Sequence, residues 1–140
     1  MRHSRCALVV LFCLAAGTAQ AGQTITAVET ESYFYADGDM KPSKGQFEIT
    51  YFLEGDKVTR TRVYDVIKKE VIPDDTVYLI MRHLASDPTM NKSGVLPSVI
   101  RAVGQPGTDA VELLVIGETF IQSTKSTSDY FVISRLKRIK

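Results

Sequence analysis

The stretch GQFEITYFLEGDKVTRTRVYDVI, residues 45–67, decides the fold class. In its first half every second side chain is large and apolar, at Phe47, Ile49, Tyr51 and Leu53. Period-two alternation is typical of a strand with one buried face. Gly55-Asp56 then supplies a tight turn, and residues 57–67 continue with a high proportion of Val, Thr and Tyr. The stretch therefore predicts a β-hairpin.

Strand-forming composition recurs on both sides of this hairpin. Four further strands are expected, at residues 24–36, 99–103, 110–120 and 130–139. Pro106-Gly107 fits the two central positions of a type II turn between the second and third of these. Val111–Ile116 is apolar on both faces, which indicates a central strand. The Ser/Thr-rich residues 123–128 are interpreted as a linker to the last strand.

Residues 75–86 change character and favour a helix. Val77, Ile80, Met81 and Leu84 recur at helical spacing behind Asp74-Asp75, whose carboxylates can accept hydrogen bonds from a first turn. An extended conformation, with Val77, Leu79 and Met81 on one face, is the alternative. Residues 97–103 also fit either a strand or a short helix capped by Gly104.

The expected fold is therefore mainly β (α+β). It is an antiparallel sheet of about six strands, curled or barrel-like, with one helix inserted near residues 75–86. No repeat or domain boundary divides residues 22–140, so a single small globular domain is expected.

Residues 1–21 have the layout of a secretory signal peptide. A basic start precedes the apolar run of residues 7–16, which is too short for a permanent bilayer anchor. Small residues at Ala19 and Ala21 predict cleavage between Ala21 and Gly22. We expect a periplasmic or secreted protein without a stable membrane anchor after cleavage.

Composition narrows the chemistry of the exported chain. Both cysteines, Cys6 and Cys13, lie in the signal, so the domain has no thiol for a disulfide, a zinc site or a nucleophile. A cysteine-free exported domain fits a bacterial envelope better than a eukaryotic secretory route. The whole chain has 17 Lys+Arg, of which Arg2 and Arg5 belong to the signal, and 16 Asp+Glu. The domain is therefore nearly neutral, and its charge indicates no nucleic-acid partner.

One histidine, His83, remains after cleavage and is the weak catalytic candidate. It could act as a general base with a carboxylate brought near by folding, such as Asp75 or Asp87, in a small hydrolase or isomerase. No motif accompanies it, and an exposed or structural histidine explains it better.

Basic residues give the weak ligand-binding candidates. Arg60 and Arg62 are expected on one face of their strand, together with Tyr64, while Arg135 and Lys137 make the C-terminus basic. If the two strands are neighbours, the result is a positive patch for an anionic group or a partner. The alternative is a solvated sheet face that protects an edge strand.

The remaining motifs are best explained as structural. Asp37-Gly38-Asp39 and Asp74-Asp75 could offer oxygen ligands to calcium, but turn chemistry and capping explain them better, so no metal or cofactor is expected. Tyr33-Phe34-Tyr35 could line a pocket mouth, although the core of a sheet is the commoner place for such residues.

Taken together, these features favour a non-catalytic binding or interaction module of the envelope. The expected ligand is a small amphiphilic molecule or a protein partner. The enzyme that uses His83 is the alternative.

Overall fold

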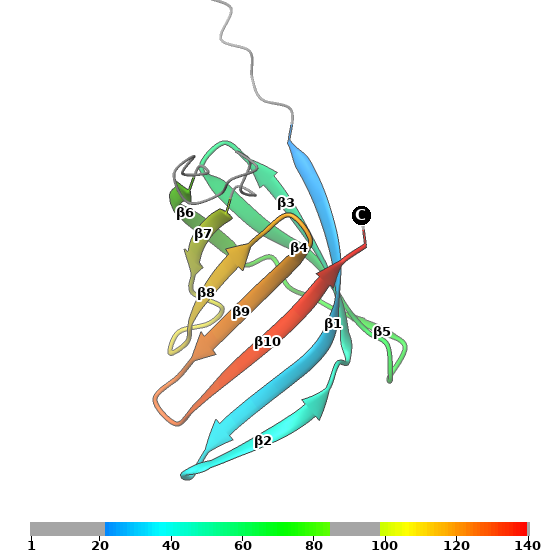
Figure 1. Cartoon of the computed structure of the whole chain (residues 1–140), viewed down its shortest axis with the longest axis vertical. Helices are drawn as coiled ribbons and strands as arrows, with labels where there is room; N and C mark the ends of the chain where they lie inside the picture. Colours follow the sequence, from blue (N-terminus) through cyan, green and yellow to red (C-terminus); the bar gives the residue numbers. More distant parts are fainter. Residues whose placement is uncertain (1–21, 85–98, 140) are drawn as a thin grey trace, which may run out of the picture.

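The computed structural model describes residues 22–84 and 99–139, and every regular element within them is a β-strand (Figure 1). The strands are β1 (Gln23–Ala36), β2 (Asp39–Lys44), β3 (Phe47–Glu54), β4 (Lys57–Asp65), β5 (Glu70–Ile72), β6 (Val77–Leu84), β7 (Val99–Gly104), β8 (Val111–Ile116), β9 (Phe120–Ser126) and β10 (Tyr130–Arg138). The hairpin expected at residues 45–67 is confirmed as β3 and β4, and Gly55 takes the positive φ of 58° that its turn requires.

The antiparallel sheet closes into an eight-stranded barrel. Its order is β1-β3-β4-β6-β7-β8-β9-β10, and β10 pairs back onto β1 from Ala27↔Arg138 to Ala36↔Tyr130. Closure pairs the strand edges that an open sheet would leave exposed. The barrel-like sheet expected from the sequence is therefore confirmed.

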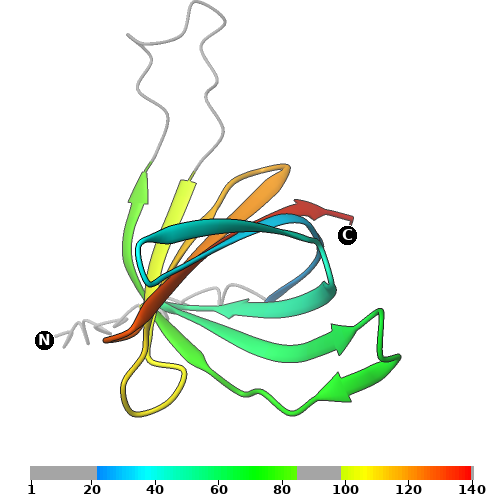
Figure 2. The same ribbon diagram turned by 90° about the horizontal axis from the view of Figure 1, so that it is seen from below.

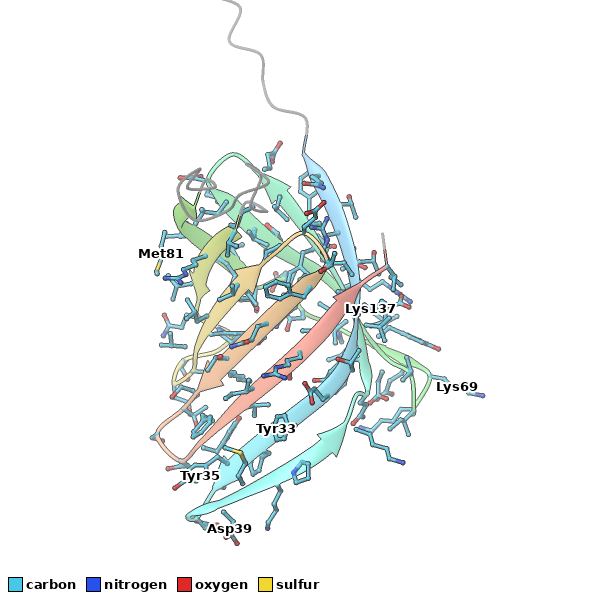
Figure 3. The ribbon with its side chains drawn as sticks, in the orientation of Figure 1. Tyr33, Tyr35, Asp39, Lys69, Met81 and Lys137 are labelled. Atoms are coloured by element: carbon cyan, nitrogen blue, oxygen red, sulfur yellow. The ribbon has the colours of Figure 1, made fainter. Side chains whose placement is uncertain are left out.

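Two short strands lie outside the ring. β2 pairs with the second half of β1, and β5 pairs with the end of β4. Seen from below, the β4–β5 hairpin extends away from the barrel (Figure 2). Lys69 stands at its tip (Figure 3) with a positive φ of 59°.

The helix predicted near residues 75–86 is wrong where the structure describes it, because Val77–Leu84 forms strand β6. Its residues pair with β7 from Tyr78↔Gly104 to Leu84↔Val99, and with β4 at residues 57–59. A helix here would leave the edges of β4 and β7 unpaired. A register shift between Ile80 and Arg82 breaks the simple alternation, which is why the apolar positions resembled a helical pattern. Residues 85 and 86 lie outside the described residues.

The extended alternative, with Val77, Leu79 and Met81 on one face, is the conformation that forms, and that face is on the outside of the barrel. Val77, Leu79 and Met81 are 47%, 54% and 60% exposed, and Figure 3 shows Met81 pointing away from the barrel. Tyr78 points inward and is fully buried.

The strand expected at residues 99–103 is confirmed as β7, and Gly104 caps no helix. A Cβ on Gly104 would lie 2.5 Å from the Tyr78 ring. Other strands were not expected from the sequence. The supposed linker at residues 123–128 is largely β9. β2 and β5 carry few apolar side chains on a regular period, so alternation could not reveal them.

The apolar core fills the middle of the barrel. Its buried members come from every strand of the ring: Ile25, Ala27, Ile49, Tyr51, Val58, Val63, Tyr78, Ala102, Leu114, Ile116, Ile121 and Leu136. Two hollows adjoin this core. One, of about 350 Å³, lies at the end where β6 and β7 lead into residues outside the described range, and Arg138 there donates to the Gly117 carbonyl at 2.8 Å. The other is the candidate site.

Candidate functional site in the barrel interior

A cavity of about 340 Å³ occupies the interior on the side of the β4–β5 hairpin. Its lining comes from eight segments of the chain: Glu29, Ser32, Phe47, Ile49, Arg60, Val63, Ile72, Asp74, Glu112, Ser123, Lys125, Val132, Ser134 and Leu136. This volume lies at the small end of the roughly 300–1,000 Å³ typical of ligand sites. Apolar side chains with a few convergent polar groups are also typical of such sites.

The cavity lining combines an apolar cluster with a row of hydroxyls. β3, β4 and β5 contribute Phe47, Ile49, Val63 and Ile72, and Val132 and Leu136 of β10 are apolar as well. The register places Ser32 against Ser134 and Ser134 against Ser123, so three serines form a row across β1, β10 and β9. Side chains at directly paired positions lie on the same face, and all three serines line the cavity.

A bulge in β1 brings Glu29 to the same wall as this row. The pairing with β10 runs Glu29↔Leu136, Glu31↔Arg135 and Ser32↔Ser134, which leaves Thr30 as an extra residue. Glu29 and Ser32, three apart in the sequence, therefore both face inward, at 7% and 8% exposure.

Gly45 fixes the surroundings of Glu29. A Cβ on Gly45 would lie 1.9 Å from the Glu29 carbonyl oxygen, so only glycine permits this approach of the chain. The next residue, Gln46, then donates its backbone N–H to Glu29 Oε2 at 2.8 Å.

A polar network surrounds Arg60, which enters the cavity from β4. Its guanidinium donates to both oxygens of Glu112, at 3.1 and 3.0 Å, and to Asp74 Oδ2 at 2.6 Å. Glu112 also accepts from the Tyr78 hydroxyl at 2.8 Å and from Ser123 Oγ at 2.5 Å. The side chains of Arg60 and Glu112 are only 10% and 3% exposed, against 20% for Asp74.

Arg60, Asp74 and Tyr78 keep their ordinary charge states in this network. Burial lowers the pKa of Arg60, but the Asp74 hydrogen bond and the Glu112 charge outweigh it and raise that pKa. Burial, reinforced by the Glu112 carboxylate, raises the pKa of Tyr78. Burial raises the pKa of Asp74, but hydrogen bonds from Arg60 and the Thr76 N–H outweigh it and lower that pKa. None of these shifts brings a group towards neutral pH, where a general acid or base works best.

Two buried donors beside this network have no hydrogen-bond partner within the described residues. They are the Tyr51 hydroxyl and the Arg60 Nε. Burial, followed by the Glu112 charge, raises the pKa of Tyr51, so its hydroxyl keeps its proton. Tyr51 and Tyr78 pack edge to face, with ring centroids 6.4 Å apart.

The expected basic patch does not form, because two of its premises are wrong. A register shift between Thr50 and Tyr51 pairs them with Arg62 and Arg60, which leaves Thr61 as a bulge. Arg60 therefore points into the barrel, whereas Arg62 lies outside, paired with Glu48 at 2.7 Å and placed over the Tyr64 ring at 4.9 Å.

The second premise was that the two basic strands are neighbours. β3 and β1 separate β4 from β10 in the ring. Arg135 lies on the outside of β10, bound to Glu31 at 2.7 Å, and Lys137 is exposed on the same strand (Figure 3). Of the five ligand-binding candidates, only Arg60 reaches the cavity.

His83 lies near the end of β6, in register with Ile100. Asp75 precedes that strand, so the extended chain from Val77 to His83, six steps or roughly 20 Å long, separates them. Asp87 lies outside the described residues. A general-base role for His83 stays a prediction.

The sequence reasoning missed most of the cavity. Glu112 had a readable signal, because it is a charged residue inside the apolar run of residues 111–116. Buried charges in such a run call for a partner. The sequence carried no such signal for Glu29, Ser32 and Ser134, because their inward orientation depends on closure of the barrel and on the bulge at Thr30. Asp74 was expected to cap a helix and instead accepts the Thr76 N–H at 2.9 Å ahead of a strand.

The rim of the cavity side carries aromatic residues. Phe34 and Tyr130 lie 5.2 Å apart between centroids, and Tyr35 stacks on Phe131 at 4.9 Å. Phe34 and Tyr35 are 38% and 36% exposed, so they belong to the barrel end and not to its core. Asp37 and Gly38, with φ of 54° and 85°, form the β1–β2 turn, as their turn chemistry predicted.

Over residues 22–84 and 99–139, no cluster of three or more His, Cys, Asp or Glu side chains is arranged to hold a metal ion. The same ranges contain no helix of sufficient length and apolarity to cross a membrane. Comparison of the chain with models of protein families, with curated proteins and with solved structures found no match to any of them.

Proposed function

We propose that this protein is a non-catalytic binding module that holds a small amphiphilic molecule inside its barrel, and that it acts in the bacterial envelope. The cavity of about 340 Å³, lined by apolar side chains together with a row of serine hydroxyls, is the observation that carries the proposal. Pockets with this division of lining bind molecules that have both an apolar body and a few polar groups. The proposal of export rests on the signal-peptide pattern of residues 1–21.

The Arg60 network supports binding over catalysis. Arg60, Asp74 and Glu112 bind one another, and the pKa shifts of Arg60 and Asp74 hold those two groups in fixed charge states. Such a network organises a cavity wall, because hydrogen-bonded buried polar groups rigidify their surroundings. The ligand then contacts side chains that have bonding capacity left.

Two measurements test the proposal. Native mass spectrometry of protein exported by a bacterial host and purified without detergent is expected to show a bound small molecule. In addition, the neutral dye N-phenylnaphthylamine is expected to bind the emptied protein with a rise in fluorescence. Protein that carries nothing and leaves the dye dark contradicts the proposal.

A matched pair of variants locates the dye. Ser134→Phe places a large ring in the cavity, whereas Ile133→Phe adds a similar ring one position away on β10, at a residue that does not line it. Dye binding is expected to disappear in the first variant and persist in the second. Circular dichroism checks that both remain folded. Equal dye binding by the two folded variants would place the dye elsewhere and contradict the assignment.

A further inference from the structure

The polar groups of the cavity divide into satisfied and available ones. Arg60, Asp74 and Glu112 bind one another. Ser123 donates to Glu112 as part of the same network. Glu29, Ser32 and Ser134 lie on β1 and β10, outside it.

Glu29 is a buried carboxylate without a counter-ion among the described residues. Glu29 is 7% exposed, and its Oε2 accepts a hydrogen bond from the Gln46 N–H. No Lys or Arg nitrogen within the described part lies within ion-pairing distance of it. A buried charge without a partner is costly, so a cation at this point of the cavity is favoured.

Two hydroxyls complete the same corner. Ser32 is 8% exposed and lines the cavity, and its side-chain hydroxyl forms no hydrogen bond with another described residue. Ser134 faces it directly across the β1–β10 ladder and likewise has a hydroxyl that no other described residue engages. A primary ammonium has three N–H donors. A carboxylate and two neighbouring hydroxyls offer it three acceptors.

We propose that the ligand is a small amphiphile with a primary ammonium head, which binds Glu29, Ser32 and Ser134. Its apolar body lies against Phe47 and Ile49 of the neighbouring strand β3. This inference rests on the proposed function and names the ligand class for the same cavity.

Lys125 sets the orientation of such a ligand. It lines the cavity from β9, in register with Glu112, and forms no ion pair with a described residue. Its positive charge disfavours a second cation nearby, so the ammonium head is directed to the β1 side. An anionic head would instead be drawn to Lys125, which makes the two ligand classes distinguishable.

Three probes with the same tail test the inference: decylamine, decanol and decanoate, each competing with N-phenylnaphthylamine for the emptied full chain. Decylamine is expected to bind most tightly, with decanol about tenfold weaker and decanoate weakest. Glu29→Gln keeps an acceptor for the Gln46 N–H and removes the charge. It is expected to weaken decylamine on the order of ten- to one-hundredfold, the range of a charge-assisted hydrogen bond, and to leave decanol unchanged.

Glu31→Gln is the control, because it removes the same charge from the outer face of the same strand, where Glu31 binds Arg135. Decylamine affinity is expected to be unchanged in it. If Glu29→Gln does not fold, Ser134→Val serves instead: it deletes one acceptor, and decylamine is expected to weaken more than decanol.

The outcomes separate the two proposals. Equal binding of decylamine and decanol overturns the ammonium assignment and leaves the cavity as a ligand site. Tightest binding of decanoate, lost in Lys125→Met, overturns it in favour of an anionic head. If the dye binds and none of the three displaces it, the ammonium assignment fails and the cavity remains a ligand site. If the dye does not bind and native mass spectrometry shows no bound molecule, the proposed function fails as well.

Discussion

The Arg60 network makes a quantitative prediction about stability. In Arg60→Met, Glu112 loses two hydrogen bonds and its charge partner, yet it remains in a position where its side chain is 3% exposed. Removing one member of a buried ion pair costs about 3–5 kcal/mol. Domains of this size have a total stability of about 5–15 kcal/mol. We therefore expect this single change to remove a fifth or more of the free energy of unfolding.

Urea unfolding followed by far-UV circular dichroism measures this loss, since the chain has no tryptophan to report by fluorescence. With a urea dependence of about 2 kcal/mol per molar, the midpoint is expected to fall by about 1.5–2.5 M. Arg62→Met is the matched control on the same strand. The Arg62 side chain is 41% exposed and pairs with Glu48, so its loss is expected to cost under about 1 kcal/mol.

The double variant Arg60→Met/Glu112→Met decides the cause. Replacing a whole buried pair by apolar residues is often neutral or stabilising. The double variant is therefore expected to recover most of the stability that Arg60→Met loses. Equal midpoints for Arg60→Met and Arg62→Met would refute the reasoning, and so would a double variant less stable than Arg60→Met alone.

Three further predictions concern acid, alkali and packing. Folding lowers the pKa of Asp74, so the stability that the Asp74 carboxylate contributes is present above its unfolded pKa and is lost as pH falls through its folded pKa. The urea midpoint is therefore expected to fall less steeply between neutral and acidic pH in Asp74→Asn than in the parent protein. The pKa values of Tyr51 and Tyr78 are raised, so their stabilisation is present below the unfolded pKa of about 10 and declines above it. In an alkaline titration of phenolate absorbance, both are expected to ionise only together with unfolding, and their ionisation in folded protein would contradict their burial. Gly104→Ala places a Cβ 2.5 Å from the Tyr78 ring and is expected to lower the free energy of unfolding by about 1–3 kcal/mol, measured as a lower melting temperature. An unchanged melting temperature would show that the Tyr78 ring moves aside and would contradict the prediction.

Alternation in the sequence was enough to identify the strands that have one regular apolar face. The β3–β4 hairpin is the clearest case, since its apolar side chains recur every second residue and a Gly-Asp turn separates the two halves. The same criterion failed for β6. There a bulge after Ile80 and an exposed apolar outer face imitate helical spacing. It also failed for β9, whose inward positions Ser123 and Lys125 are polar because they line a cavity.

The candidate site was less accessible to sequence reasoning than the fold. Arg60 was selected for the wrong environment, because the bulge at Thr61 turns it inward and separates it from Arg62. A one-residue insertion of this kind reverses the facing of every later side chain, and no local pattern announces it.

By itself, the sequence determined the β-rich character of the chain, its main hairpin, the absence of cysteine after residue 13 and the signal-peptide pattern. These are properties of local composition and period, which act over a few residues. The tertiary structure alone decided that β10 returns to β1, that Glu29, Ser32 and Ser134 share one wall, and that Arg60 meets Glu112 across 52 positions of chain. Closure and bulges create these contacts between distant residues. The cavity therefore exists only once the ring is complete.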